Sequence, residues 1–136
     1  MAQALIATSA SIVWALGGLH WVYTFRSSKL HPRDPELEAR LRAVSPVITR
    51  ETTMWKAWIG FNASHALGAV LFGSVYGYLA LAHGAFLFGS PFLCIVGALL
   101  LAAYLVLAKL YWFRVPFLGI LVALVCYVAG LVVAFA

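Results

Sequence analysis

Charged residues are scarce in this sequence. Its 136 residues include nine Lys or Arg and four Asp or Glu, whereas 65% of the residues are hydrophobic. Soluble domains carry about 25% charged residues, so this chain lacks the polar surface that would cover a water-soluble particle. The composition therefore excludes a soluble globular domain and indicates a protein that lies in lipid.

Charge is absent from three long stretches of the chain. All charged residues fall within residues 26–56 and 109–114, so the N-terminal, middle and C-terminal stretches carry none. A membrane-spanning helix needs about 20 mostly apolar residues, so the first and last stretches each fit one helix and the middle one fits two. We therefore predict an all-α, antiparallel four-helix transmembrane bundle. This single membrane domain, 1–136, has spans at about 2–24, 54–82, 91–110 and 115–136.

Catalytic motifs are also lacking. No Asp or Glu falls within a predicted span, which argues against a proton-coupled transporter because such proteins usually rely on a buried carboxylate. There is no glycine-rich phosphate loop and no readable Ser/His/Asp spacing. Cys94 and Cys126 lie in spans without metal-ligand spacing, and we expect free thiols rather than a disulfide. These absences favour a protein that is not an enzyme.

The basic residues predict the orientation of the chain. All nine lie in or beside the connection between the first and second spans or the one between the third and fourth, and these two connections share one side of the membrane. The positive-inside rule places that side in the cytoplasm. We expect an integral protein of a plasma or inner membrane, with both termini outside and loop 25–53 cytoplasmic. Because orientation explains the basic residues, no nucleic-acid partner is expected.

The cytoplasmic loop contains helix signals. Asp34-Pro35 is typical of an N-cap followed by proline at the first helical position. Apolar residues then recur at helical spacing: Leu37, Leu41 and Val44. This pattern predicts a short amphipathic helix on the inner membrane surface, and the alternative is a solvated connector with some helix. Ser45-Pro46 repeats the signal and predicts a second short helix.

Polar residues occur within the second predicted span. One helical stripe there contains Trp55, Trp58, Asn62, His65, Ala69, Phe72 and Tyr76. Polar side chains at membrane depth usually face the protein interior, so we expect this stripe to face the bundle. His20 in the first span has about the same depth as Asn62, which predicts a cluster of His20, Asn62 and His65. The aromatic residues expected around it are Trp14, Trp21, Trp58 and Tyr104.

Four interpretations of this cluster stay open. It can be a structural hydrogen-bond network, or a pocket for an amphipathic lipid, quinone or pigment. Two imidazoles can also ligate haem, or one histidine can act as a general acid or base. His31 and His83 lie outside the spans and are expected to be solvated rather than ligands.

Small residues recur every four positions in the second span. One such face contains Gly60, Ser64 and Gly68, and another contains Gly73 and Gly77. Faces of this kind allow close helix contact in lipid. They can pack within one bundle or bind other copies or a larger complex, which favours a homo-oligomer or a subunit of a membrane complex.

The plan of four spans, external termini and a long basic first loop resembles the MAPEG family of glutathione-linked membrane enzymes. Lys56-Ala57 followed by Asn62 and His65 is the nearest match to the basic–Ala, Asn and Glu pattern of the family's second span. The spacing differs, the Glu is missing and the arginines of the third span are absent. The resemblance therefore covers topology, and it implies a trimer that binds glutathione.

The leading expectation is a small non-catalytic membrane subunit or accessory protein that packs against other membrane proteins, lipids or a cofactor. The alternatives are a ligand-binding bundle around His20, Asn62 and His65 and a MAPEG-like enzyme.

Overall fold

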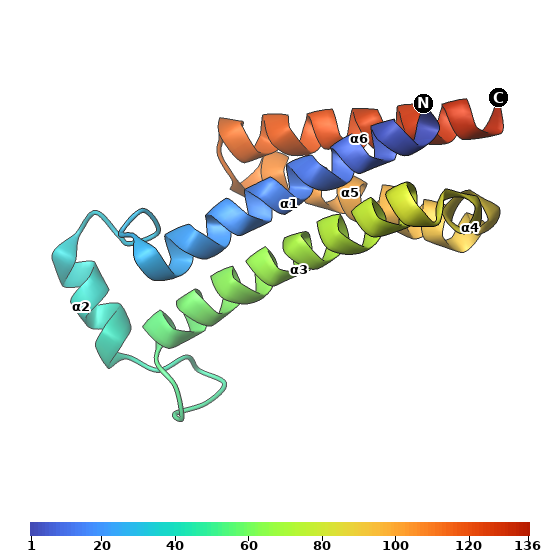
Figure 1. Ribbon diagram of the computed structural model, residues 1–136. Helices are drawn as coiled ribbons and strands as arrows, with labels where there is room; N and C mark the ends of the chain where they lie inside the picture. Colours follow the sequence, from blue (N-terminus) through green and yellow to red (C-terminus); the bar gives the residue numbers. More distant parts are fainter. The chain divides into compact units, whose positions relative to one another are not determined.

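The computed structural model describes all residues, 1–136, and is entirely helical (Figure 1). The helices in chain order are α1 (Ala2–Arg26), α2 (Pro35–Ala43), α3 (Met54–Ala82), α4 (Gly84–Gly89), α5 (Pro91–Tyr111) and α6 (Arg114–Phe135). By length and composition, α1, α3, α5 and α6 can each cross a membrane. The predicted all-α fold with four spanning helices is confirmed, and the chain fits an integral membrane protein.

The chain divides into two compact units. Unit 1 comprises Met1–Leu16 and Ala69–Ala136, and unit 2 comprises Gly17–Gly68. Helices α1 and α3 each contribute one part to unit 1 and the other part to unit 2. Unit 2 contains all four acidic residues of the chain and seven of its nine basic residues.

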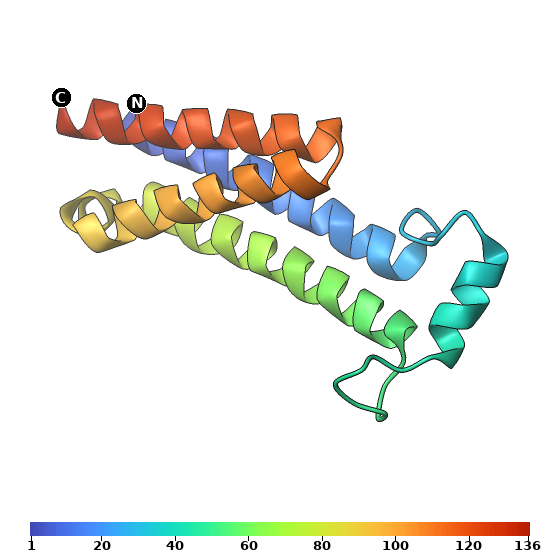
Figure 2. The same cartoon turned by 180° about the vertical axis from the view of Figure 1, so that it is seen from behind.

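The core of unit 1 is apolar and comes from all its helices, among which α5 and α6 lie side by side (Figure 2). Its buried residues are Ile6, Ala10, Val13, Ala69, Phe72, Tyr76, Ala80, Leu87, Leu101, Ile120, Ala123 and Tyr127. Many large apolar side chains point outward instead, for example Leu99, Val125 and Val132. Such exposure is expected where the surrounding medium is lipid.

Helices α1 and α3 approach each other closely within unit 1. A Cβ atom on Gly73 would lie 2.6 Å from the backbone oxygen of Ala10 and 2.6 Å from the Cβ of Trp14. A Cβ on Gly77 would make an ordinary contact with the Ala10 Cβ at 3.6 Å. The Gly73 and Gly77 face of α3 is therefore used inside the protein.

Two tyrosines connect three helices of unit 1. The hydroxyl of Tyr76 in α3 donates a hydrogen bond to the backbone oxygen of Leu93 in α5, at 2.8 Å. The hydroxyl of Tyr127 in α6 donates to the backbone oxygens of Cys94 and Leu93, at 3.2 and 3.4 Å. Gly97 makes room for these rings because any side chain there would overlap the Tyr127 hydroxyl.

The connection between α3 and α5 is itself helical. Residues Gly84–Gly89 form the short helix α4, which lies between the second and third predicted spans. The start of α5 is capped, because the Oγ of Ser90 accepts a hydrogen bond from the backbone NH of Leu93 and Pro91 opens the helix. Cys94 and Cys126 are free cysteines.

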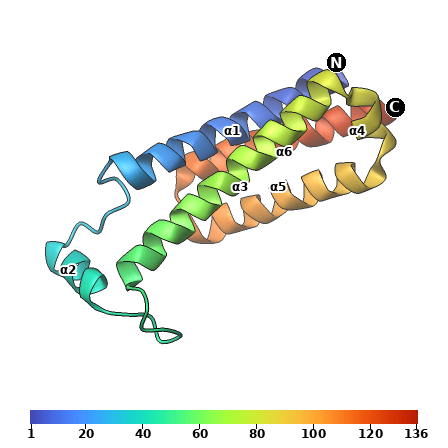
Figure 3. The same cartoon turned by 60° about the horizontal axis from the view of Figure 1, so that its bottom comes forward.

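In unit 2, α2 begins as its sequence predicts. The Oδ1 of Asp34 accepts hydrogen bonds from the backbone NH groups of Glu36 and Leu37, at 2.9 and 3.4 Å. Figure 3 shows α2 and the loop that returns from it to the start of α3. The position of α2 on a membrane surface stays a prediction.

The second short helix that was predicted at Ser45-Pro46 does not form. Ser45-Pro46 begins only a turn, in which the backbone NH of Thr49 donates to the Pro46 oxygen at 3.3 Å. The residues that follow are rich in β-branched side chains, which fit a helix poorly. They are Val47, Ile48, Thr49, Thr52 and Thr53.

Candidate functional site

Unit 2 brings together the three polar residues that were expected to cluster. His20 comes from α1, and Asn62 and His65 lie one turn apart on α3. The Nε2 atom of His20 lies 3.0 Å from the Oδ1 of Asn62. The rings of His20 and His65 meet edge to face, with centroids 5.4 Å apart and an interplanar angle of 87°.

The neighbouring hydrogen bonds define the proton positions in this polar cluster. The Nδ2 of Asn62 donates to the backbone oxygen of Trp58 at 2.8 Å, so the Oδ1 faces His20 as an acceptor. The Nε2 of His20 must therefore carry a proton and donate it to Asn62. The Oγ1 of Thr24 donates to the backbone oxygen of His20 at 2.8 Å. This network links α1 to α3 through a polar contact inside two apolar helices.

The geometry limits the chemistry of the polar cluster. Bis-histidine haem ligation needs two imidazoles that face each other across the porphyrin plane. An edge-to-face contact leaves no space for that plane, and the Nε2 of His20 is directed to Asn62. No group of three or more His, Cys, Asp or Glu side chains is placed to hold a metal ion. The arrangement suits hydrogen bonding, either between the two helices or to a polar ligand group.

The four aromatic residues expected around the cluster fall into both units. Trp21 and Trp58 belong to unit 2, where Trp21 packs on Phe25 with ring centroids 4.9 Å apart. Trp14 and Tyr104 belong to unit 1, where Trp14 lies against Gly73. Trp58 is 45% exposed, although the other aromatic residues of its stripe on α3 are buried. Its Nε1 donates to the backbone oxygen of Leu30 at 3.0 Å.

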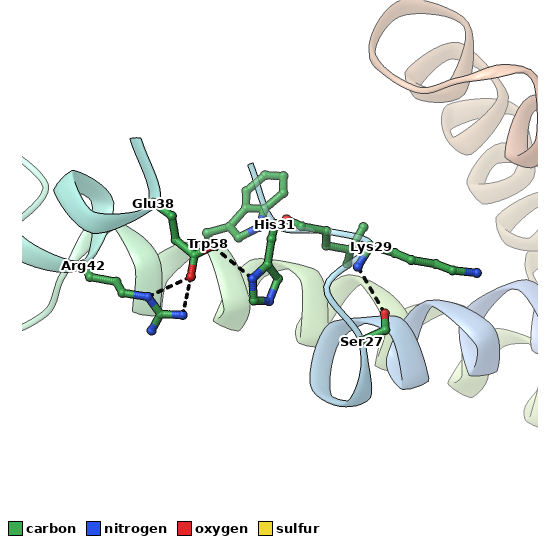
Figure 4. Close-up of polar contacts among 7 residues, drawn as sticks. Ser27, Lys29, His31, Glu38, Arg42 and Trp58 are labelled. Atoms are coloured by element: carbon green, nitrogen blue, oxygen red, sulfur yellow. Dashed lines mark hydrogen bonds and ion pairs between the residues drawn. The ribbon is translucent and has the colours of Figure 1, made fainter. Parts of the chain in front are cut away.

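A second polar cluster lies in the loop and includes His31, which was expected to be solvated (Figure 4). Glu38 of α2 lies between two partners. Its Oε2 is 3.1 Å from the Nδ1 of His31, and its Oε1 accepts hydrogen bonds from the Nη2 and Nε of Arg42, at 2.7 and 3.0 Å. His31 is therefore a partly buried member of a network and is not simply solvated.

Trp55 of α3 forms the base of this second cluster. It is only 8% exposed. The ring of His31 meets it edge to face, with centroids 4.8 Å apart, and the guanidinium of Arg42 lies 4.2 Å from its ring centroid. A cation over a tryptophan ring is attractive, so these contacts fasten α2 to the start of α3. The spacing of Glu38 and Arg42, which suits a helical ion pair, was the signal in the sequence.

The electrostatics of Glu38 follow from its partners. The hydrogen bond from Arg42 is the main cause that lowers the pKa of Glu38 below its ordinary value, and His31 acts in the same direction. Partial burial opposes them but does not prevail. The ionised form of Glu38 is therefore the one that the loop structure favours.

A groove opens beside this cluster. It has a volume of about 280 Å³ and is lined by Leu30, His31, Pro32, Leu41 and Trp58. Its walls are mainly apolar, with one imidazole as the polar group.

A further surface on α3 is uncovered. A Cβ on Gly60 would meet no atom within 4 Å. Ser64, one turn later, is exposed, and its hydroxyl donates only to the backbone oxygen of Phe61 in its own helix, at 3.0 Å. The Gly60 and Ser64 face thus has no partner helix within unit 2.

No protein-family model, no curated protein and no solved structure matches this chain. The resemblance to the MAPEG family stays a prediction from topology. Functional inferences therefore depend on the residues of the chain itself.

Proposed function

We propose that this protein is a small non-catalytic membrane subunit or accessory protein, and that the Gly60 and Ser64 face of α3 packs against another membrane helix. The observation that carries this proposal is the open space around Gly60, which no side chain of unit 2 fills. The Gly73 and Gly77 face of the same helix supports it, because α1 packs closely against that surface.

The physics of helix contact in lipid supports such a role. The hydrophobic effect does not drive helix association in lipid, so close van der Waals packing on small residues contributes much of the association free energy. Gly60 and Ser64 offer a flat surface, and the large exposed side chains of Phe61 and Leu67 flank it. A partner helix can fit between these flanks and bury the small residues.

The polar cluster is compatible with a non-catalytic role. Both groups of the Asn62 amide are engaged, one with His20 and one with the backbone of its own helix. A network of this kind holds helices together in lipid, where interhelical hydrogen bonds contribute about 0.6 kcal/mol on average.

The proposal is tested with Gly60→Leu. The protein is expressed in its native membrane, extracted in a mild detergent and weighed by native mass spectrometry. We expect a larger assembly for the wild type and its loss in the variant. Ala103→Leu, at an exposed small residue of α5, is the control and should keep the assembly. A wild-type monomer, or assembly that survives Gly60→Leu, would contradict the proposal.

A second candidate function is binding of an amphipathic ligand through His20, Asn62 and His65. The contact between the two imidazoles favours it, because it places several polar groups together within apolar helices. The wild type should then retain a lipid, quinone or pigment that native mass spectrometry or an absorption spectrum detects. His20→Ala and His65→Ala should release it at unchanged fold, as judged by circular dichroism. Retention of the same molecule by both variants would exclude this function.

A further inference from the structure

The loop between α2 and α3 ends in a closed tip. The backbone NH of Met54 donates to the backbone oxygen of Val44 at 2.9 Å and closes the loop at its base. Within it, the turn at Pro46 and a hydrogen bond from the Glu51 NH to the Thr49 Oγ1, at 3.1 Å, fix the chain further. The residues between these bonds are therefore held in place as a defined surface.

Two aliphatic side chains occupy the end of this tip. Val47 is fully exposed and Ile48 is 91% exposed. Val44 at the base of the loop is also exposed. β-Branched aliphatic residues in this position are costly in water, because their apolar surface gains nothing from the rest of the chain. A partner outside the chain that covered them would gain the free energy of burying this apolar surface.

Positive charge accompanies these residues. Arg50 is exposed and takes part in neither of the two ion pairs of the chain. Arg40 of α2 and Lys56 of α3 are exposed as well, while Glu51 is the one acidic residue next to Arg50. Unit 2 as a whole has seven basic and four acidic side chains, a formal net charge of +3. The tip is thus apolar, carries one unpaired arginine and belongs to a unit of net positive charge.

The position in the chain restricts what this surface can reach. Arg50 lies four residues before Met54, where the candidate span α3 begins. Four residues extend over at most about 14 Å, and the headgroup layer of one leaflet is roughly 6 Å deep. The tip is therefore within reach of the membrane–water interface, whichever other proteins are present.

We propose that the tip, residues 46–50, binds a membrane surface that contains anionic lipids. Val47 and Ile48 enter the boundary between headgroups and acyl chains, and Arg50 contacts lipid phosphates. Apolar anchors beside basic residues are the combination that anionic interfaces bind. A protein partner would also cover apolar residues, but the lipid interface lies within reach of the tip whether or not a protein partner is present, and this favours lipid. The proposal does not depend on the function proposed above.

The test places a fluorophore that reports polarity on the tip. Ile48→Cys is made in a Cys94→Ala, Cys126→Ala background, labelled, and reconstituted in nanodiscs of phosphatidylcholine with or without phosphatidylglycerol. Lipids that carry quenchers in their acyl chains measure insertion. Glu36→Cys, at an exposed position of α2, is the matched control. Circular dichroism confirms that both labelled proteins are folded.

We expect quenching at residue 48 to be several-fold stronger than at residue 36 and to increase with phosphatidylglycerol. Adding Arg50→Gln should reduce the preference for the anionic membrane about fivefold. Three results would each overturn the proposal. The first is equal quenching at residues 48 and 36. The second is insertion that changes neither with phosphatidylglycerol nor with Arg50→Gln. The third is a fluorophore that is shielded from water but not reached by the lipid quenchers, because this would indicate a protein contact.

Discussion

Gly73 of α3 lies so close to Trp14 of α1 that a Cβ on Gly73 would stand 2.6 Å from the Trp14 Cβ. A Cβ atom is bonded directly to the helix backbone, so neither the Cβ on Gly73 nor that of Trp14 could move away by a side-chain rotation. The contact explains why this position tolerates no side chain, whereas Gly60, on the same helix, has open space around it.

We predict that Gly73→Ala destabilises the protein by about 1–3 kcal/mol, the usual cost of overpacking. Gly60→Ala is the matched control and should be neutral or slightly stabilising, because alanine favours helix over glycine. Denaturant unfolding in detergent, followed by circular dichroism, measures both. Equal stabilities of the two variants would show that α1 and α3 are not in close contact at Gly73.

Asn62→Leu should lower the free energy of unfolding, because it removes the hydrogen bond between Asn62 and His20. We expect a cost of about 0.6 kcal/mol, and at most about 2 kcal/mol, as for other interhelical hydrogen bonds in membranes. A double-mutant cycle with His20→Leu isolates the pairwise energy. Ser64→Ala, which removes a bond within its own turn, should not couple to His20. A coupling energy of zero between Asn62 and His20 would argue against their hydrogen bond.

Replacing Ser9 with alanine should increase the stability of the protein. Its side chain is completely buried, and its Oγ has no hydrogen-bond partner. A buried polar group without a partner costs about 1–3 kcal/mol, so Ser9→Ala is expected to stabilise the protein by roughly 1 kcal/mol. Thr24→Val is the contrast, because the buried Thr24 hydroxyl donates to His20, and it should destabilise. A clear loss of stability in Ser9→Ala would reveal a partner for this hydroxyl.

Helix α2 should become less ordered at acid pH. Because its partners lower the pKa of Glu38 in the folded state, the contribution of Glu38 is complete above its unfolded pKa, about 4.3, and disappears as pH falls through the lower folded value. The protection factors of the α2 amides, which correct hydrogen exchange for its intrinsic pH dependence, should therefore fall in that acid range. Glu38→Gln should remove this dependence, and Glu36→Gln, at a residue outside both ion pairs, should keep it. An unchanged profile in Glu38→Gln would show that Glu38 does not control α2.

The sequence predicts those parts of the structure that depend on regular spacing. The charge-free stretches give the four spanning helices, the Asp34 and Ser90 caps begin α2 and α5, and helical periodicity on α3 brings Asn62 and His65 to the side where His20 lies. Each of these is a local or periodic property, which a single sequence displays directly.

Other parts depend on tertiary contacts that no spacing reveals. The small-residue faces at Gly60 and Gly73 look alike in the sequence, but only the second meets another helix within its own unit. The placement of Trp55 beneath His31 and Arg42 requires the loop to fold back on α3, and loop length does not specify that path.

The backbone oxygen of Leu93, which accepts hydrogen bonds from Tyr76 and Tyr127, has a consequence for how unit 1 opens. If α3, α5 or α6 withdrew alone, a hydroxyl or a carbonyl would be stranded in an apolar environment without water. These three helix segments should therefore separate together, as one cooperative step. The first turns of α5 should then be among the last parts of the molecule to exchange their amide protons for deuterium.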